Sequence, residues 1–215
     1  TQVYRARVRY GTAWYHGVQG GVATMTAVPA DSVTDRLLDG LAASVRERGY
    51  RDTTVADIVR HARTSKRTFY EQFDSKDRCL IELLRRNNDD LIAAILAAVD
   101  AQADWRIQIR QSVDAYVEHI GARPAITLSW IREAPALGAE AQPLHRQAMV
   151  KLTDMLVTLT GNPGFRRAGI SPVSASTALI LLGGVRELTA LLVEDGGDVR
   201  EIAGPAVAAA TALLG

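Results

Sequence analysis

Two short helices, a tight turn between them and the start of a third helix are predicted within residues 50–78. Side chains that cap helices stand at the right places: Thr54 with Asp57, then Thr64 or Ser65, then Asp74 or Ser75. Between the first two caps, apolar residues recur at helical spacing as Val55, Ile58, Val59 and Ala62. Capped helices joined by so short a turn have the layout of a helix-turn-helix.

The second of these helices has two unlike faces. Phe69 and Phe73 stand four residues apart, so both point the same way, into a core. The opposite surface carries Lys66, Arg67, Tyr70 and Glu71. From Arg60 to Thr68 there are four basic residues and no acidic one, which suits a helix that enters a DNA groove lined by phosphates. The alternative is an ordinary solvated charged face over two core phenylalanines.

Residues 47–76 also match a known family at several short stretches. These are Glu47-Arg48-Gly49-Tyr50, Thr53-Thr54-Val55, Asp57-Ile58, Ser65-Lys66, Thr68-Phe69-Tyr70, Phe73, Ser75 and Lys76. The pattern resembles the DNA-binding domain of the tetracycline-repressor (TetR) family over about residues 32–84. The resemblance implies an all-α, ligand-responsive transcriptional regulator, most simply a repressor released from a palindromic operator by a small-molecule effector.

The resemblance also implies roles for single side chains. Phosphates would be held by Thr54, Tyr70 and Lys76, and base edges would be faced or approached by Thr64, Ser65, Lys66, Arg67 and Thr68. Arg67 is expected to read guanine, because its planar fork can bond two acceptors on one base edge. Two departures stand out: Arg63 occupies the turn where the family often has glycine, and Arg67 stands where it often has a small residue.

Length and charge suggest three segments. The 215 residues, 47% of them hydrophobic, can bury a sizeable core. Residues 1–78 carry 13 Lys or Arg against 9 Asp or Glu, whereas residues 79–215 carry 12 against 15. We expect an N-terminal extension at 1–30, a helix-turn-helix DNA-binding domain at 31–78, and an effector-binding and dimerisation domain at 79–215.

The extension alternates Tyr4, Ala6, Val8 and Tyr10 with three arginines, a period typical of a strand, and Gly11-Thr12 could turn it into a short hairpin. Such a basic arm could reach the DNA minor groove. The alternative is a loose extension whose true start lies nearer Met25.

Most of the remaining residues are predicted to be helical. A bracing helix is predicted at 32–48 and ends at Gly49; later helices are predicted at 75–100, 104–121, 124–133, 139–160, 172–194 and 198–213, with a loop at Asn162-Pro163-Gly164. Apolar, small-residue faces on the helices at 172–194 and 198–213 fit a homodimer interface, which the resemblance also implies. Gly183-Gly184 interrupts the first of them and calls for a packing reason, such as the close approach of a second helix. The alternative is that both are internal core helices of a monomer.

The middle helices are expected to hold a partly apolar effector. The candidate ligand-binding residues are Trp105, Ile109, Arg110, Tyr116, His119, Trp130, Met149 and Met155. His119 and Arg110 are the expected polar anchors. Arg186 is either another anchor or the partner of an acidic residue across the interface.

Other functions have less support. The four histidines are scattered without metal-ligand spacing. Asp114 and Glu118 stand four residues apart and could do acid–base work, but with Arg110 one turn away they are interpreted as a solvated charged face. No catalytic residue, metal or cofactor is predicted. A single cysteine, Cys79, fits the cytoplasm and is interpreted as a small buried hydrophobe, the alternative being a redox sensor. Neither a secretory signal nor a membrane span is predicted. The main alternative function is a helical small-molecule-binding protein without sequence-specific DNA binding.

Overall fold

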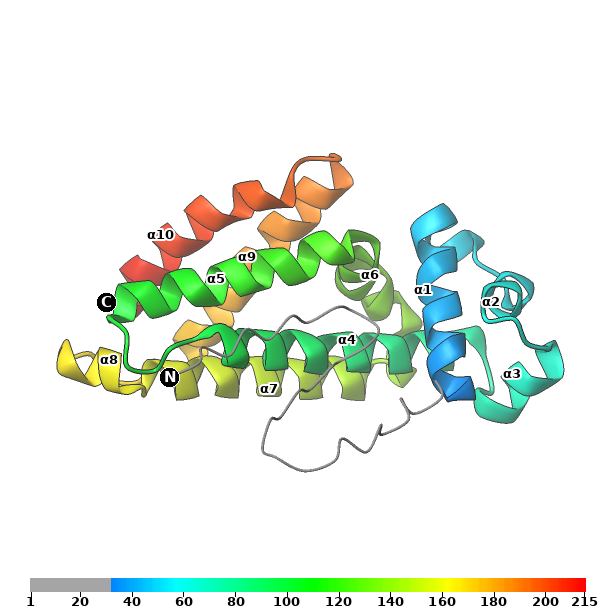
Figure 1. The fold of residues 1–215 in the computed structure, drawn as a ribbon, viewed down its shortest axis with the longest axis horizontal. Helices are drawn as coiled ribbons and strands as arrows, with labels where there is room; N and C mark the ends of the chain where they lie inside the picture. Colours follow the sequence, from blue (N-terminus) through cyan, green and yellow to red (C-terminus); the bar gives the residue numbers. More distant parts are fainter. Residues whose placement is uncertain (1–31) are drawn as a thin grey trace, which may run out of the picture. The chain divides into compact units, whose positions relative to one another are not determined.

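A computed structural model describes residues 32–215, which are helical and contain no strand (Figure 1). The all-α prediction is confirmed for this part of the chain. The predicted hairpin and basic arm in residues 1–30 lie outside the described residues.

Three helices form the N-terminal module: α1 (Val33–Asp52), α2 (Val55–His61) and α3 (Lys66–Gln72). Ser32 caps α1 by accepting from the Asp35 N–H at 3.0 Å, and Asp35 bonds back to the Ser32 N–H. Gly49 interrupts α1 at a φ of +77°, so the regular helix stops at the glycine that the sequence analysis chose, and one further turn follows. Thr54 caps α2 and Ser65 caps α3 in the same way, which explains why helices of only seven residues form here.

The module shares one core with the start of α4 (Lys76–Ala98). Leu37, Leu41, Ile58, Phe69 and Leu80 are buried together in it. Gly40 lets α1 and α2 approach, because a Cβ added there would lie 2.6 Å from the carbonyl oxygen of Ile58. α4 continues through the predicted domain boundary at residues 78 and 79, and its second half contributes Leu91 and Ile95 to another core.

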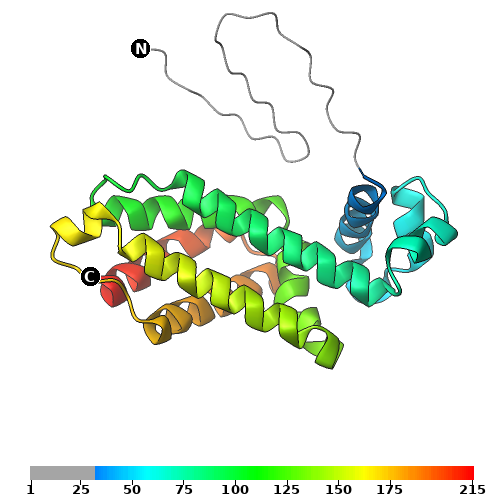
Figure 2. The ribbon, with the colours of Figure 1, turned by 90° about the horizontal axis from the view of Figure 1, so that it is seen from below.

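Two further helices pack along α4, namely α5 (Trp105–Ala122) and α7 (Gln142–Thr160). They are joined by α9 (Ala175–Glu194) and α10 (Ala203–Leu214) (Figures 1 and 2). α10 packs against α5 and α9, and α7 packs against α4 and α9. The layers formed in this way surround the cavity described below.

The link between the two parts departs from the prediction. The single helix expected at 124–133 is α6 (Pro124–Leu128) followed by a π-helical turn, η1 (Ser129–Glu133). A 3-10 segment, η2 (Ala134–Glu140), comes next; Gly138 has a φ of +64° there, so α7 starts at Gln142 instead of residue 139. π-helical turns are rare and often lie at functional sites.

Three other boundaries were wrong. The expected loop at residues 162–164 begins a short helix, α8 (Pro163–Arg167), because Pro163 occupies the first helical position, where its fixed φ favours a helix. α9 starts at Ala175, since Ser174 caps it by accepting from the Thr177 N–H at 3.1 Å, and Pro172 lies before that cap. The last helix begins as the 3-10 turn η3 (Val199–Ile202) and becomes α10.

Candidate DNA-binding and ligand-binding sites

The first turn of α3 gathers the residues expected to meet DNA bases. Ser65 caps α3 by accepting from the Thr68 N–H at 3.0 Å, and its hydroxyl also bonds that of Thr68 at 2.9 Å. Lys66 and Arg67 follow on the exposed side of the helix. The Arg67 side chain is 89% exposed and pairs with Glu71 one turn later, at 3.0 Å. α3 therefore presents polar and basic groups to solvent while Phe69 holds it to the core.

The turn before α3 is made by Arg63, whose φ is +50°. The Thr64 N–H donates to the carbonyl of Val59 at 3.0 Å and closes the turn. Arg63 is the one non-glycine residue with positive φ among residues 32–215. Arg63, which stands where the family often has glycine, thus holds the strained backbone position, since residues other than glycine rarely adopt this conformation.

The expected phosphate-binding residues differ in availability. Tyr70 is 57% exposed, and Thr54 is exposed at the start of α2. The Thr54 hydroxyl donates to Asp57 at 2.6 Å, and this bond together with the Thr54 N–H lowers the pKa of Asp57 to about 2. Lys76 instead turns inward: its ammonium donates to the carbonyls of Tyr50 and Thr53 at 3.0 and 2.8 Å. Its observed contacts are therefore with the C-terminal end of α1.

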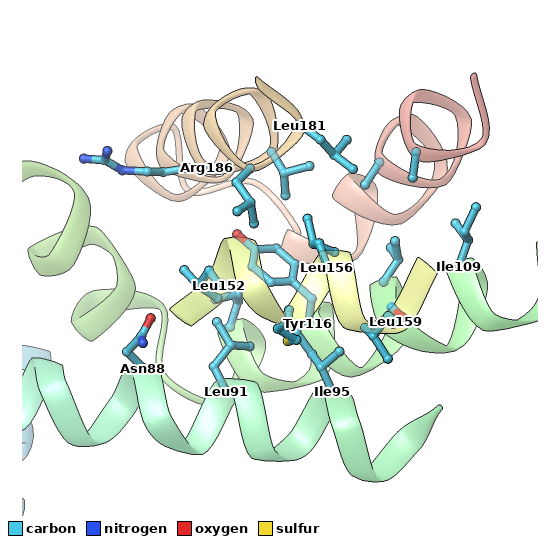
Figure 3. Close-up of a pocket in the computed structure, with 18 of the residues that line it drawn as sticks. Asn88, Leu91, Ile95, Ile109, Tyr116, Leu152, Leu156, Leu159, Leu181 and Arg186 are labelled. Carbon is cyan, nitrogen blue, oxygen red and sulfur yellow. The ribbon is translucent and has the colours of Figure 1, made fainter. Parts of the chain in front are cut away.

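A cavity of about 150 Å³ lies among α4, α5, α7, α9 and α10, with η1 at its margin (Figure 3). Most side chains around it are apolar, including Leu91, Ile95, Leu152, Leu156, Leu159 and Leu181. Tyr116 projects into it, and its hydroxyl bonds that of Thr189 at 2.7 Å. Burial raises the pKa of Tyr116 to about 12, so this group is neutral near pH 7. The cavity suits a mainly apolar ligand with few polar groups.

The structure places five of the eight predicted ligand-binding residues around the cavity: Ile109, Tyr116, Trp130, Met149 and Met155. It places the other three elsewhere. Trp105 does not line the cavity but packs on Phe165, which does, with ring centroids 6.0 Å apart. His119 is buried against Asn87, 3.2 Å from its amide oxygen, and Arg110 lies on the exposed side of α5. Neither expected polar anchor therefore reaches the cavity.

The α4 side of the cavity was not predicted from the sequence; Asn87, Asn88, Leu91 and Ile95 line it there. A signal was present, because two adjacent asparagines continue the apolar register that runs from Leu83 to Leu91, and both are buried. Arg186, named as a possible anchor, does line the cavity, and its Nη2 donates to the carbonyl of Ile131 at 3.0 Å.

One side of α9 is largely exposed among the described residues. Leu179, Ile180 and Leu191 are 50%, 67% and 50% exposed on it. Gly183 and Gly184 share this side, and a Cβ added to either would meet no atom within 4 Å. By length and composition α9 could cross a membrane, which the sequence analysis did not expect. An apolar helix at a subunit interface satisfies the same criteria.

Comparison with known proteins bears on the N-terminal module. The family model described as "Bacterial regulatory proteins, tetR family" matches residues 37–83, which run from α1 into α4. The HTH-type transcriptional repressor KstR2 of Rhodococcus jostii (strain RHA1) is 36% identical over 104 residues, covering 46% of this chain and 51% of KstR2. The module from α1 into α4 is therefore a DNA-binding module of the TetR type.

Two further proteins define the extent of the likeness. The HTH-type transcriptional activator FasR of Mycolicibacterium smegmatis (strain ATCC 700084 / mc(2)155) is 28% identical over 101 residues, covering 47% of this chain and 46% of FasR. The chain thus spans about half the length of the relatives it matches. The crystal structure of FadR from Bacillus subtilis in complex with stearoyl-CoA is similar to 83% of this chain over 96% of the FadR chain. The TM-score is 0.69 and the sequence identity is 15%. At that identity the likeness shows the fold.

Proposed function

We propose that this chain is a ligand-responsive, DNA-binding transcriptional regulator of the TetR family, most simply a repressor that a small-molecule effector releases from a palindromic operator. The observation that carries the proposal is the capped α3, which presents Lys66 and Arg67 to solvent at its first turn. A helix of this kind can place its N-terminal side chains against base edges in the major groove. The relatives include both a repressor and an activator by name, so repression is the finer part of the proposal.

A homodimer is part of the proposal. The uncovered side of α9, together with the small exposed residues Ala208, Ala209 and Ala212 of α10, offers a surface for the same helices of a second copy. Each glycine inside a helix costs about 1 kcal/mol relative to alanine. Among the described residues no neighbour requires glycine at positions 183 and 184, and the close approach of a partner helix supplies the reason. A two-fold dimer would match the symmetry of paired DNA half-sites.

The segment from α6 to η2 supports communication between the cavity and the DNA-binding module. Trp130 and Ile131 of η1 line the cavity. Two residues later, Glu133 pairs with Arg51 of α1 at 3.1 Å, and Ala134 is buried in the same core as α1. A ligand that moves η1 would therefore also move a segment packed on α1. We therefore propose that residues 31–78 form the DNA-binding domain and that residues 79–215 form the domain that binds the effector.

The mechanism we propose has two states. Successive major grooves on one face of DNA lie about 34–36 Å apart. The effector binds more tightly to a dimer whose two α3 helices do not match this spacing, and so it lowers operator affinity. The coupling cannot exceed the effector's preference between the two states. The apolar cavity, and the presence of stearoyl-CoA in the FadR complex, favour an effector with a large apolar part. Effector-controlled DNA binding of this kind would take place in the cytoplasm, where the DNA and the effector are both present.

The test is selection of bound sites from random duplex DNA, followed by the affinity of the enriched site across a series of salt concentrations. An enriched palindrome and a steep loss of affinity with salt are expected, because basic groups that neutralise phosphates release counterions. Weak binding without enrichment would contradict the proposal and favour a helical small-molecule-binding protein. A reporter placed behind the enriched site then separates repression from activation.

A further inference from the structure

We infer that the effector is an apolar carboxylate, whose single anionic group binds Arg186 at the η1 end of the cavity while its apolar body fills the remainder. The inference rests on the proposed function, because it names the chemical class of the effector for the same cavity.

Arg186 is the one charged side chain among the described residues that line the cavity. In Figure 3 it lies toward the end marked by Asn88, away from Ile109. Within residues 32–215 its guanidinium makes one hydrogen bond, from Nη2 to the carbonyl of Ile131 at 3.0 Å. Its Nε is buried and has no hydrogen-bond partner. A buried donor without an acceptor is costly, so an acceptor delivered by a ligand would be favoured here.

A second unsatisfied buried atom belongs to the neighbouring His145, whose Nδ1 also has no hydrogen-bond partner. The two are the only such side-chain atoms found in residues 32–215. The His145 ring stacks on Trp130, which lines the cavity, with centroids 5.8 Å apart. Burial and the nearby charge of Arg186 lower the pKa of His145, so its ring is neutral near pH 7. A neutral imidazole can donate one hydrogen bond, and an anion that approaches Arg186 offers several acceptor sites.

The acidic residues nearby are engaged elsewhere. Glu187 follows Arg186, but both of its carboxylate oxygens bond Arg132, at 2.9 and 3.1 Å. Glu194 also bonds Arg132, at 2.6 Å. No carboxylate within residues 32–215 lies at ion-pair distance from Arg186, although Glu187 still acts on it through space. The Arg186 charge is therefore uncompensated by a direct partner, and the apolar remainder of the lining disfavours a second charge on the ligand.

The test measures ligand binding by isothermal titration calorimetry on the full chain without DNA. The probes are octanoate, decanoate and 4-phenylbutyrate, each compared with the primary alcohol of the same carbon skeleton. For at least one pair, the carboxylate is expected to bind at least about tenfold more tightly than the alcohol. The reason is that a carboxylate makes a charge-assisted hydrogen bond with the Arg186 guanidinium, which is stronger than the bond a hydroxyl makes. Arg186→Met should abolish this preference and leave the affinity for the alcohol within about threefold. Arg186→Gln serves as the second variant if Arg186→Met does not fold.

Arg110→Met is the matched control, because Arg110 is an arginine on the exposed side of α5 and does not line the cavity. It should keep the preference for carboxylates. Equal affinity for acids and alcohols, a preference that survives both Arg186 variants, or failure of every carboxylate to bind below 1 mM would overturn the inference. Failure of the proposed function has a different signature, namely no enriched DNA site. An enriched site released only by uncharged ligands would uphold the function and overturn the inference.

Discussion

The ammonium of Lys76 donates to the carbonyl oxygen of Thr53 at 2.8 Å, across 23 residues of sequence. It also bonds the carbonyl of Tyr50 at 3.0 Å and lies 4.3 Å from the centre of the Tyr50 ring. The first residue of α4 therefore closes the end of α1, where carbonyl groups lack helical partners. Contact with a DNA phosphate would have to coexist with these bonds or replace some of them.

Lys76→Ala is expected to lower the free energy of unfolding by about 1–2 kcal/mol, because charge-assisted hydrogen bonds to partly buried carbonyls are lost. DNA of every sequence should bind more weakly, since the end of α1 and the start of α4 are no longer joined. Urea denaturation and fluorescence anisotropy measure the two effects. Lys66→Ala, on the exposed side of α3, is the control: its stability should stay within about 0.5 kcal/mol of the wild type. Unchanged stability in Lys76→Ala would contradict the capping role.

Arg67→Ala should relax base preference at one position of each half-site, at a cost of about 1–3 kcal/mol on the preferred sequence. The physical reason is the loss of a fork that can bond two acceptors of one guanine. Competition between the selected site and single-base variants measures the effect. Glu71→Gln removes the carboxylate that Arg67 bonds at 3.0 Å and should keep the base preference while strengthening binding. An equal loss on all sequences in Arg67→Ala would show that Arg67 holds a phosphate instead.

Sequence rules predicted correctly those features that depend on residues close together in the chain. The cap at Thr54 and the stop at Gly49 were predicted, and the caps at Ser65 and Ser75 were each predicted as one of two neighbouring residues, because caps depend on residues close in sequence. The π-helical turn η1 was not predicted, since its apolar residues would suit an ordinary helix and its form depends on packing against α9 and α1. The ligand-binding residues also depend on position within the fold: Arg110 was expected to be a polar anchor and Arg186 either an anchor or an ion-pair partner, and only Arg186 lines the cavity.

Arg63→Gly is expected to raise the free energy of unfolding by up to about 1 kcal/mol. A non-glycine residue in the left-handed conformation costs about 1–2 kcal/mol, and the greater freedom of glycine in the unfolded chain cancels part of the gain. Urea denaturation tests this. Arg63→Ala removes the same side chain but keeps the strain of a φ near +50°, so it should give no gain in stability. Equal stabilisation by both variants would mean that the charge of Arg63, and not its backbone conformation, is unfavourable.

Cys79 should be inert to thiol reagents in the folded protein. It is fully buried, and burial raises the pKa of its thiol to about 12. The thiolate is the reactive form, so modification at pH 8 should require unfolding. Because the folded pKa lies above the unfolded value, this thiol's contribution to stability is complete below about pH 9 and is lost as the pH rises toward 12. Rapid labelling of the native chain by a disulfide reagent would support the redox-sensor alternative.

Ile180→Asp should shift the protein from dimer to monomer, with a dimer dissociation constant at least tenfold higher, because burying an unpaired carboxylate at a helix–helix interface is costly. Ile180 is 67% exposed on the uncovered side of α9. Ile107→Asp is the matched control, since Ile107 is 52% exposed on α5 and lies outside the proposed interface. Sedimentation velocity over a range of concentrations distinguishes the variants. The monomeric variant should keep its helix content but bind one half-site weakly, since the two α3 helices are no longer linked. If both variants stay dimeric, or both dissociate, α9 is not the interface that we propose.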